Sequence, residues 1–96
     1  MILHTLNASP SSIAFRDCLA ALAPGDCLLL LGDGVYAAIS SAPDWEALVS
    51  IGADIYLLED DARAAGVLGM ETGAERIDMD GFVELSERCT RQMAWY

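Results

Sequence analysis

Cysteine is the residue type in this sequence with the most direct chemical potential. The 96-residue chain has three cysteines, and two of them, Cys18 and Cys27, fall in one stretch, FRDCLAALAPGDCLLLL, at 15–31. A thiolate is a nucleophile, whereas a buried thiol behaves as a small apolar side chain. Because three is an odd number, the cysteines do not suit a framework of paired disulfides, and reduced thiols are expected.

Position along the chain separates the three thiols. Cys27 begins a wholly apolar run, and Cys89 lies on the apolar stripe of a predicted helix, so both are predicted to fill a core. Cys18 lies about six residues after a predicted helix start, beyond the first turn in which the helix dipole could lower the pKa of a thiol. The residues alone favour an inert Cys18 and leave a reactive one as the alternative.

A second candidate is the run LLLLGDGVYAA at 28–38, which has the strand, glycine turn and helix of a nucleotide-binding loop. The third glycine of G-x-G-x-x-G is missing and no lysine follows. Asp33 would also place negative charge where a phosphate has to lie. We therefore expect a structural turn in which Asp33 caps the next helix, with a nucleotide-binding regulator as the alternative.

The remaining candidates are His4 and a group of acids. His4, the only histidine, lies near the predicted carboxyl end of the first strand, where parallel sheets gather ligands, so it could donate a proton or partner a thiol. A buried histidine held by a backbone hydrogen bond explains the same residue. Glu59, Asp60 and Asp61 are expected at a helix start, with Asp60 or Asp61 as its cap. One histidine and three separated cysteines do not make a zinc site, so no metal and no cofactor are expected.

Charge excludes several classes of partner. The chain has 15 acidic residues against five arginines and no lysine, for a net charge of −10. Such a surface repels nucleic acid and anionic membranes. The amino-terminal residues lack the features of a signal peptide, and the longest strongly apolar run, 27–31, is far shorter than the ~20 residues of a membrane-spanning helix. A cytoplasmic location is therefore expected.

Short apolar runs alternate with helical patterns along the whole chain. Strands are predicted at 2–6, 27–31, 54–58, 75–79 and 92–96, and helices from Ser11 or Ser12, at 35–40, from Pro43 or Asp44 to Gly52, up to Gly66, and at 81–89. This alternation predicts one α/β domain over 1–96, with three layers and a five-stranded, mostly parallel sheet that has helices on both faces. With 54% hydrophobic residues, some apolar surface should stay outside and meet a protein partner.

Five motifs, in this order over nearly the whole chain, resemble the DsrH/TusB family of the DsrE-like sulfur-relay proteins: LHTLNASP, LLLLGDGVYAA, YLLEDDARAAG, DGFVELSERC and QMAW. The resemblance implies an accessory subunit of a heterohexamer with sister subunits of the DsrE/DsrF or TusC/TusD type. It also implies transfer of persulfide sulfur between proteins, either for 2-thiolation of the tRNA wobble uridine, as in TusB, or for intracellular sulfur oxidation, as in DsrH. No cofactor is implied.

The resemblance also separates roles within the complex. In the family the main carrier cysteine belongs to the larger sister subunit, near the start of the helix after the third strand, and 58–61 of this chain holds no cysteine. Cys18 matches a first-helix cysteine of the DsrH branch that TusB-type members generally lack, which makes it the candidate catalytic thiol. Ala65 stands where the family commonly has an arginine. The alternatives are a non-catalytic assembly module with inert cysteines, and an isolated chain that forms a homo-oligomer.

Overall fold

A single sheet of five parallel strands forms the centre of the molecule. The computed structural model describes residues 1–38, 42–66 and 74–96, and its strands are β1 (Ile2–Leu6), β2 (Cys27–Leu30), β3 (Asp54–Leu58), β4 (Ala74–Ile77) and β5 (Arg91–Trp95). Their order across the sheet is β4-β3-β2-β1-β5, and each neighbouring pair is parallel. The predicted fold class is confirmed, including the fifth strand, and the sheet is parallel throughout.

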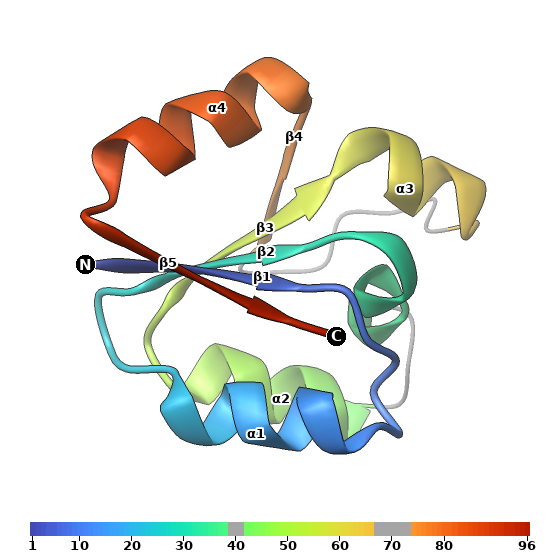
Figure 1. Cartoon of the computed structure of the whole chain (residues 1–96). Coiled ribbons are helices and arrows are strands. Elements are labelled where there is room, and N and C mark those ends of the chain that lie inside the picture. Colours follow the sequence, from blue (N-terminus) through green and yellow to red (C-terminus); the bar gives the residue numbers. More distant parts are fainter. Residues whose placement is uncertain (39–41, 67–73) are drawn as a thin grey trace.

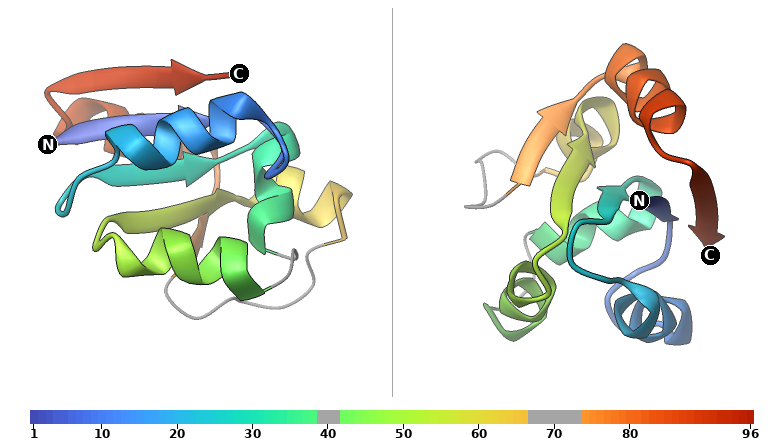
Figure 2. Two further views of the ribbon diagram at one scale, coloured as in Figure 1. Left: turned by 90° about the horizontal axis from the view of Figure 1, so that it is seen from below. Right: turned by 90° about the vertical axis from the view of Figure 1, so that its left-hand side faces the viewer.

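Helices cover both faces of this sheet (Figures 1 and 2). The first two α-helices, α1 (Ile13–Ala21) and α2 (Ala42–Ser50), lie side by side on one face, and α4 (Met79–Arg88) lies on the other. The short helix α3 (Glu59–Ala64) and the 3-10 helix η1 (Gly32–Ala38) lie at the end of the sheet where the strands terminate. The result is the expected three-layer arrangement.

Strand β2 is apolar at every position because both of its faces are buried. Leu28 and Leu30 pack into the core beside α1 and α2, whereas Cys27 and Leu29 pack into the core beside α4. Successive side chains of a strand point to opposite faces, and a strand covered on both faces therefore has no polar side. The thiol of Cys27 occupies one of these apolar positions, as predicted.

The predicted cap of α1 is confirmed, whereas α4 begins at Met79 and not at the predicted residue 81, so that Asp78 and Met79 do not belong to the strand predicted at 75–79. Ser12 caps α1, since its Oγ accepts a hydrogen bond from the Phe15 amide at 3.1 Å, and Asp78 caps α4 by accepting from Gly81 at 2.9 Å. The prediction that Asp60 or Asp61 caps α3 is wrong. Its cap residue is Leu58, two or three residues earlier, and that cap makes no side-chain hydrogen bond. Residues 39 and 40 of the predicted helix at 35–40 lie outside the described residues.

The Gly-Asp-Gly turn after β2 requires glycine for packing. Gly32 has a φ of +51°, and a Cβ there would overlap the side-chain amide of Asn7. A Cβ on Gly34 would overlap the backbone carbonyl of Leu6, at the end of the neighbouring strand. Both glycines therefore allow the chain leaving β2 to pass close to the end of β1.

We expect Gly34→Ala to lower the free energy of unfolding by roughly 2 to 4 kcal/mol, because the new methyl group meets rigid backbone. Urea denaturation measures the loss. Gly25→Ala is the matched control: Gly25 has a φ of +88° with open space around a Cβ, so only backbone strain of about 1 kcal/mol is expected. Equal losses in the two variants would contradict the packing account.

Candidate functional site

Cys18, the predicted catalytic thiol, lies inside the core between α1 and the sheet. Its exposed fraction is 0%, and it belongs to the apolar cluster that also contains Phe15 of the same helix. Burial raises the pKa of Cys18 from 9.0 to about 12. A thiol in that state carries almost no thiolate at neutral pH, so Cys18 is not activated by its own chain.

His4 lies in the middle of β1, not near its carboxyl end, and it is completely buried. Its Nε2 lies 3.1 Å from Oδ2 of Asp26, and the indole Nε1 of Trp95 lies 3.2 Å from its Nδ1. The two rings are stacked, with centroids 6.3 Å apart. The expectation of a histidine at the ligand-binding edge is wrong, and its partners are side chains, not the backbone.

The Trp95 contact determines which nitrogen of His4 carries a proton. An indole N–H can only donate a hydrogen bond, so Nδ1 of His4 must accept it and must lack a proton. Nε2 then carries the single proton and donates it to the Asp26 carboxylate. His4 therefore joins two partners, one through each of its ring nitrogens.

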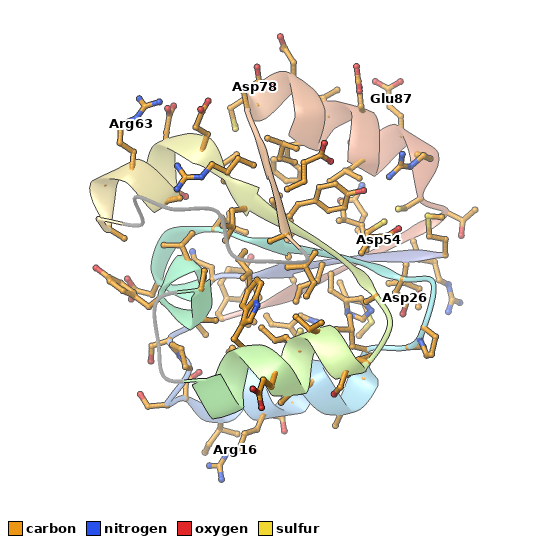
Figure 3. The ribbon with its side chains drawn as sticks, turned by 180° about the vertical axis from the view of Figure 1, so that it is seen from behind. Arg16, Asp26, Asp54, Arg63, Asp78 and Glu87 are labelled. Atoms are coloured by element: carbon orange, nitrogen blue, oxygen red, sulfur yellow. The ribbon has the colours of Figure 1, made fainter. Side chains whose placement is uncertain are left out.

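Asp26 is the one buried acid among the described residues. Oδ1 accepts a hydrogen bond from the Ile2 amide at 3.1 Å, and Oδ2 accepts from the Ala23 amide at 3.1 Å as well as from His4. Burial acts to raise the pKa of Asp26, but the donors from Ile2, His4 and Ala23 together outweigh it, and the pKa lies below the usual value of 3.8. Asp26 lies at the loop that leads into β2 (Figure 3).

Protein groups occupy the amides of the Gly-Asp-Gly turn. Gly32 donates to Oδ2 of Asp61 at 2.8 Å, Asp33 donates to Oδ1 of Asn7 at 3.3 Å, and Gly34 donates to the carbonyl of Leu31 at 2.9 Å. A phosphate-binding loop needs these N–H groups to be free.

The hollow beside the turn, about 200 Å³, is lined by the carboxylates of Asp33 and Asp61 together with Gly32, Tyr36, Ala64 and Ala65. Two carboxylates disfavour an anion there. The arrangement supports the structural turn over the nucleotide-binding alternative. The prediction that Asp33 caps the next helix is wrong, because η1 begins at Gly32 and Asp33 lies within its first turn. The contacts that hold the turn come from Asn7 and Asp61.

The acids of α3 have separate tasks. Asp61 holds the Gly32 amide, whereas Glu59 and Asp60 each lie near the Arg63 guanidinium, at 3.7 and 3.6 Å. Figure 3 shows Arg63 pointing away from the sheet. These exposed pairs contribute little, of the order of 0.5 kcal/mol each. None of the three acids forms an acid–base pair with a described nucleophile.

Cys27 and Cys89 are brought together on the α4 side of the sheet. Both are buried in the same apolar cluster. Burial first, and the neighbouring Cys27 thiol second, raise the pKa of Cys89. The guanidinium of Arg88 reaches Sγ of Cys27 at 3.9 Å. The prediction that both thiols are buried is confirmed, but the sequence did not indicate that two cysteines 62 positions apart share one cluster.

Within 1–38, 42–66 and 74–96, no three histidine, cysteine or acidic side chains gather closely enough to hold a metal ion. Over the same residues, no helix combines the length and apolar character that crossing a membrane requires.

Apolar side chains remain exposed on the last strand. Arg91, Gln92, Met93 and Ala94 are exposed, and Tyr96 just beyond the strand is 83% exposed. Because β5 pairs only with β1 in the sheet order, its outer edge is not covered by a described strand. An edge with exposed apolar side chains is a surface that another chain can cover.

Comparison with known proteins identifies the family. The family profile described as "DsrH like protein" matches residues 8–92. The chain belongs to the DsrH family. Proteins named TusB match this DsrH-family chain along its whole length: those of Erwinia tasmaniensis and Klebsiella pneumoniae are 38% identical and that of Salmonella dublin is 39% identical, over 98% of this chain and 100% of theirs.

Two solved structures share the fold of this DsrH-family chain. The crystal structure of the YchN protein from E. coli superposes with a TM-score of 0.76 over 97% of each chain, at 16% sequence identity. The solution structure of Tm0979 from Thermotoga maritima gives a TM-score of 0.68 over 92% of this chain and 93% of its own, at 19% identity. These likenesses support the fold and carry no argument about activity.

The Asp26 carboxylate gives a prediction about acid stability. In Asp26→Asn, one carboxylate oxygen that accepts hydrogen bonds is replaced by an amide N–H₂ group, which can only donate. The N–H groups that now bind this oxygen would lose their acceptor, so we expect a loss of about 2 to 3 kcal/mol in the free energy of unfolding at pH 7. Because the pKa of Asp26 is lower in the folded chain, its contribution is complete above about pH 3.8 and disappears as the pH falls through the lower folded value.

Urea unfolding at pH 7 and in a series below pH 4 measures this effect. The difference between the original chain and Asp26→Asn should shrink as the pH falls. Asp17→Asn, at an exposed position of α1, is the matched control and should change stability by less than about 0.5 kcal/mol. A difference in unfolding free energy between the original chain and Asp26→Asn that stays constant down to pH 2 would contradict the proposed role of the Asp26 charge.

Proposed function

We propose that this chain is an accessory subunit of a cytoplasmic sulfur-relay complex, and that its first task is assembly. The observation that carries the proposal is the full-length similarity to the DsrH family and its TusB members, in a chain whose three thiols are all buried. A subunit of a sulfur-transfer complex without an accessible thiol of its own would act mainly through its partners. The helix start after β3 also has Glu59 and two aspartates where the resemblance puts the carrier cysteine of the larger sister subunit.

The proposed partners are sister subunits of the TusC/TusD or DsrE/DsrF type. The exposed edge and apolar side chains of β5 support an interface there, and the tail at Tyr96 continues the same surface. A pair of strands from two chains would satisfy the outward backbone groups of β5 while burying Met93. The net charge of −10 fits a subunit that leaves contact with tRNA to another chain of the complex.

Of the two pathways, we favour 2-thiolation of the tRNA wobble uridine, because the curated relatives at 38 and 39% identity are named TusB. Intracellular sulfur oxidation is the second candidate, and one residue favours it: Cys18 matches the first-helix cysteine of the DsrH branch. A strain lacking this gene would distinguish them, since the first pathway predicts loss of 2-thiouridine from tRNA and the second predicts impaired oxidation of reduced sulfur.

Assembly is tested by co-expression with the TusC- and TusD-type subunits of the same organism. We expect one complex on size-exclusion chromatography, and we expect Met93→Glu to weaken it at least about tenfold, because the new carboxylate would be buried without a partner. Met93 is 41% exposed, so the variant chain should still fold.

Met79→Glu is the matched control, since Met79 is 58% exposed but lies on α4. It should leave the affinity of the complex unchanged. A chain that elutes alone in the presence of its sisters would rule out the assembly role. Wild-type affinity in Met93→Glu would rule out β5 as the interface.

We further propose that Cys18 takes up sulfur only within the assembled complex. Its thiolate would attack the outer sulfur of a donor persulfide, the S–S bond of the donor would break, and the donor would leave as a thiolate, with the new persulfide on Cys18. In the isolated chain this step is blocked, since the thiol is buried and its pKa is about 12. A sister subunit would have to open α1 or supply positive charge.

Mass spectrometry after incubation with a persulfide donor tests this role. We expect a gain of about 32 Da on the Cys18 peptide in the complex and none in the isolated chain. Cys18→Ser and Cys18→Ala, the second of which keeps an apolar side chain in the core, should both lower sulfur transfer by the complex. If both variants assemble and transfer sulfur at the original rate, Cys18 is inert and the chain is a non-catalytic assembly module.

A further inference from the structure

The edge strand β5 is exposed along most of its length. Arg91, Gln92, Met93 and Ala94 are all exposed, and because successive side chains alternate, both faces of this part of the strand lie open. Parallel strands are usually covered on both faces, and a strand without a buried face specifies its pairing register only weakly. The register of β5 therefore has to be fixed by a side chain elsewhere in the strand.

Trp95 is the residue of β5 that packs against the core. Its side chain is partly buried and contacts the apolar cluster on the α1 side of the sheet, to which Cys18 also belongs. A second side-chain contact of β5 runs from Nε2 of Gln92 to the carbonyl of Ser86, but it is exposed and 3.5 Å long. A hydrogen bond of that length is weak. Trp95 is therefore the main anchor of the strand.

The contact between Trp95 and His4 runs diagonally across the two paired strands. Trp95 pairs with Leu6 in the register of the sheet, and His4, two positions before Leu6 on β1, lies on the same face. Nε1 of Trp95 donates to Nδ1 of His4 at 3.2 Å, and the two ring planes are 17° apart. His4 is completely buried, and its other nitrogen lies 3.1 Å from the Asp26 carboxylate, so the acceptor has a fixed position.

The bond to His4 is made in one register of β5. A shift by one position would turn the indole of Trp95 to the α4 face of the sheet, away from His4. A shift by two positions would keep the face but displace the indole by about 6.6 Å along β1, so the present bond would break. Either shift would leave Nδ1 of His4 buried without its donor, which costs free energy. The imidazole therefore selects the register.

We propose that Trp95 is the positioning residue of β5: its bond to His4 fixes the strand in one register, and that register decides what β5 presents to a partner chain. A slip by one position would turn Met93 to the opposite face and move the outward backbone groups of the strand. Trp95 acts through His4 on the α1 side of the sheet and does not need to touch the partner. The register concerns the isolated chain, whereas the effect on a partner rests on the proposed assembly through β5.

Nuclear magnetic resonance of the full chain without partners tests the register. The Asn7 amide donates to the carbonyl of Trp95 at 2.9 Å, so its hydrogen exchange reports on the closure of β5. In Trp95→Phe, which keeps an apolar ring and removes the N–H, we expect the Asn7 amide to exchange about threefold to tenfold faster. The Overhauser effect between the methyl groups of Thr5 and Ala94, which pair across β1 and β5, should weaken. Amides between β2 and β3 should keep their exchange rates.

Two variants are the controls for this experiment. Tyr96→Phe changes the neighbouring aromatic residue, which is 83% exposed, and should leave exchange at Asn7 unchanged. Asp78→Ala removes the cap of α4 directly after β4, at the opposite edge of the sheet, so it should lower the melting temperature without changing exchange at Asn7. Unchanged exchange at Asn7 in Trp95→Phe, or equal acceleration throughout the sheet, would overturn the positioning role.

The effect on a partner is measured by mixing the purified chain with the TusC- and TusD-type subunits. We expect Trp95→Ala to weaken the complex at least about tenfold, because a strand without its anchor spends less time in the register that binds. A disulfide between Thr5→Cys and Ala94→Cys, at positions that pair across β1 and β5, would restore the register without the indole. This bridge should return the affinity of Trp95→Ala to that of a bridged chain that keeps Trp95.

The outcomes separate positioning from direct contact. Wild-type affinity in Trp95→Ala would overturn the positioning role in assembly. An affinity that stays low with the bridge would overturn it as well, since the indole would then act by touching the partner. If the parent chain itself does not assemble with the sister subunits, the proposed function fails, whereas exchange at Asn7 still decides whether Trp95 fixes β5.

Discussion

The sheet depends on one buried negative charge, the carboxylate of Asp26. It accepts from the amide at the start of β1, from the loop before β2 and from His4, and His4 in turn accepts from Trp95 of β5. One anion thus connects β1 and the loop before β2 directly, and the edge strand β5 through the imidazole of His4. A carboxylate buried without such donors would destabilise the fold.

A second set of contacts lies at the carboxyl ends of the strands. In open parallel sheets, ligands usually bind beyond the carboxyl ends of the strands. Here that region is filled by the chain itself, because Asn7 and Asp61 occupy amides of the turn after β2 and a carbonyl of β1 closely approaches Gly34. Among the described residues, the edge of β5 is a surface that stays open to a partner chain.

Much of the architecture could be predicted because the strands and helix starts depend on patterns of neighbouring residues. The uninterrupted apolar run of β2 indicates a strand covered on both faces, and Ser12 marks the start of α1 as a cap. The polar network could not be predicted, since His4 lies 22 positions from Asp26 and 91 from Trp95. The same holds for Cys27 and Cys89, which the topology alone brings together. At α3, the acids that look like caps were misleading because Asp61 bonds to a turn distant in the sequence.

The three cysteines have the same side chain, but they lie in two layers whose surroundings differ chemically. On the α1 side, Cys18 lies among apolar groups, and burial alone raises its pKa, so only a change in its surroundings could make it nucleophilic. On the α4 side, Sγ of Cys27 lies 3.9 Å from the Arg88 guanidinium, and Cys27 shares an apolar cluster with Cys89. The sheet separates the two layers. A partner that opens α1 could therefore expose Cys18 without disturbing the two cysteines on the other face.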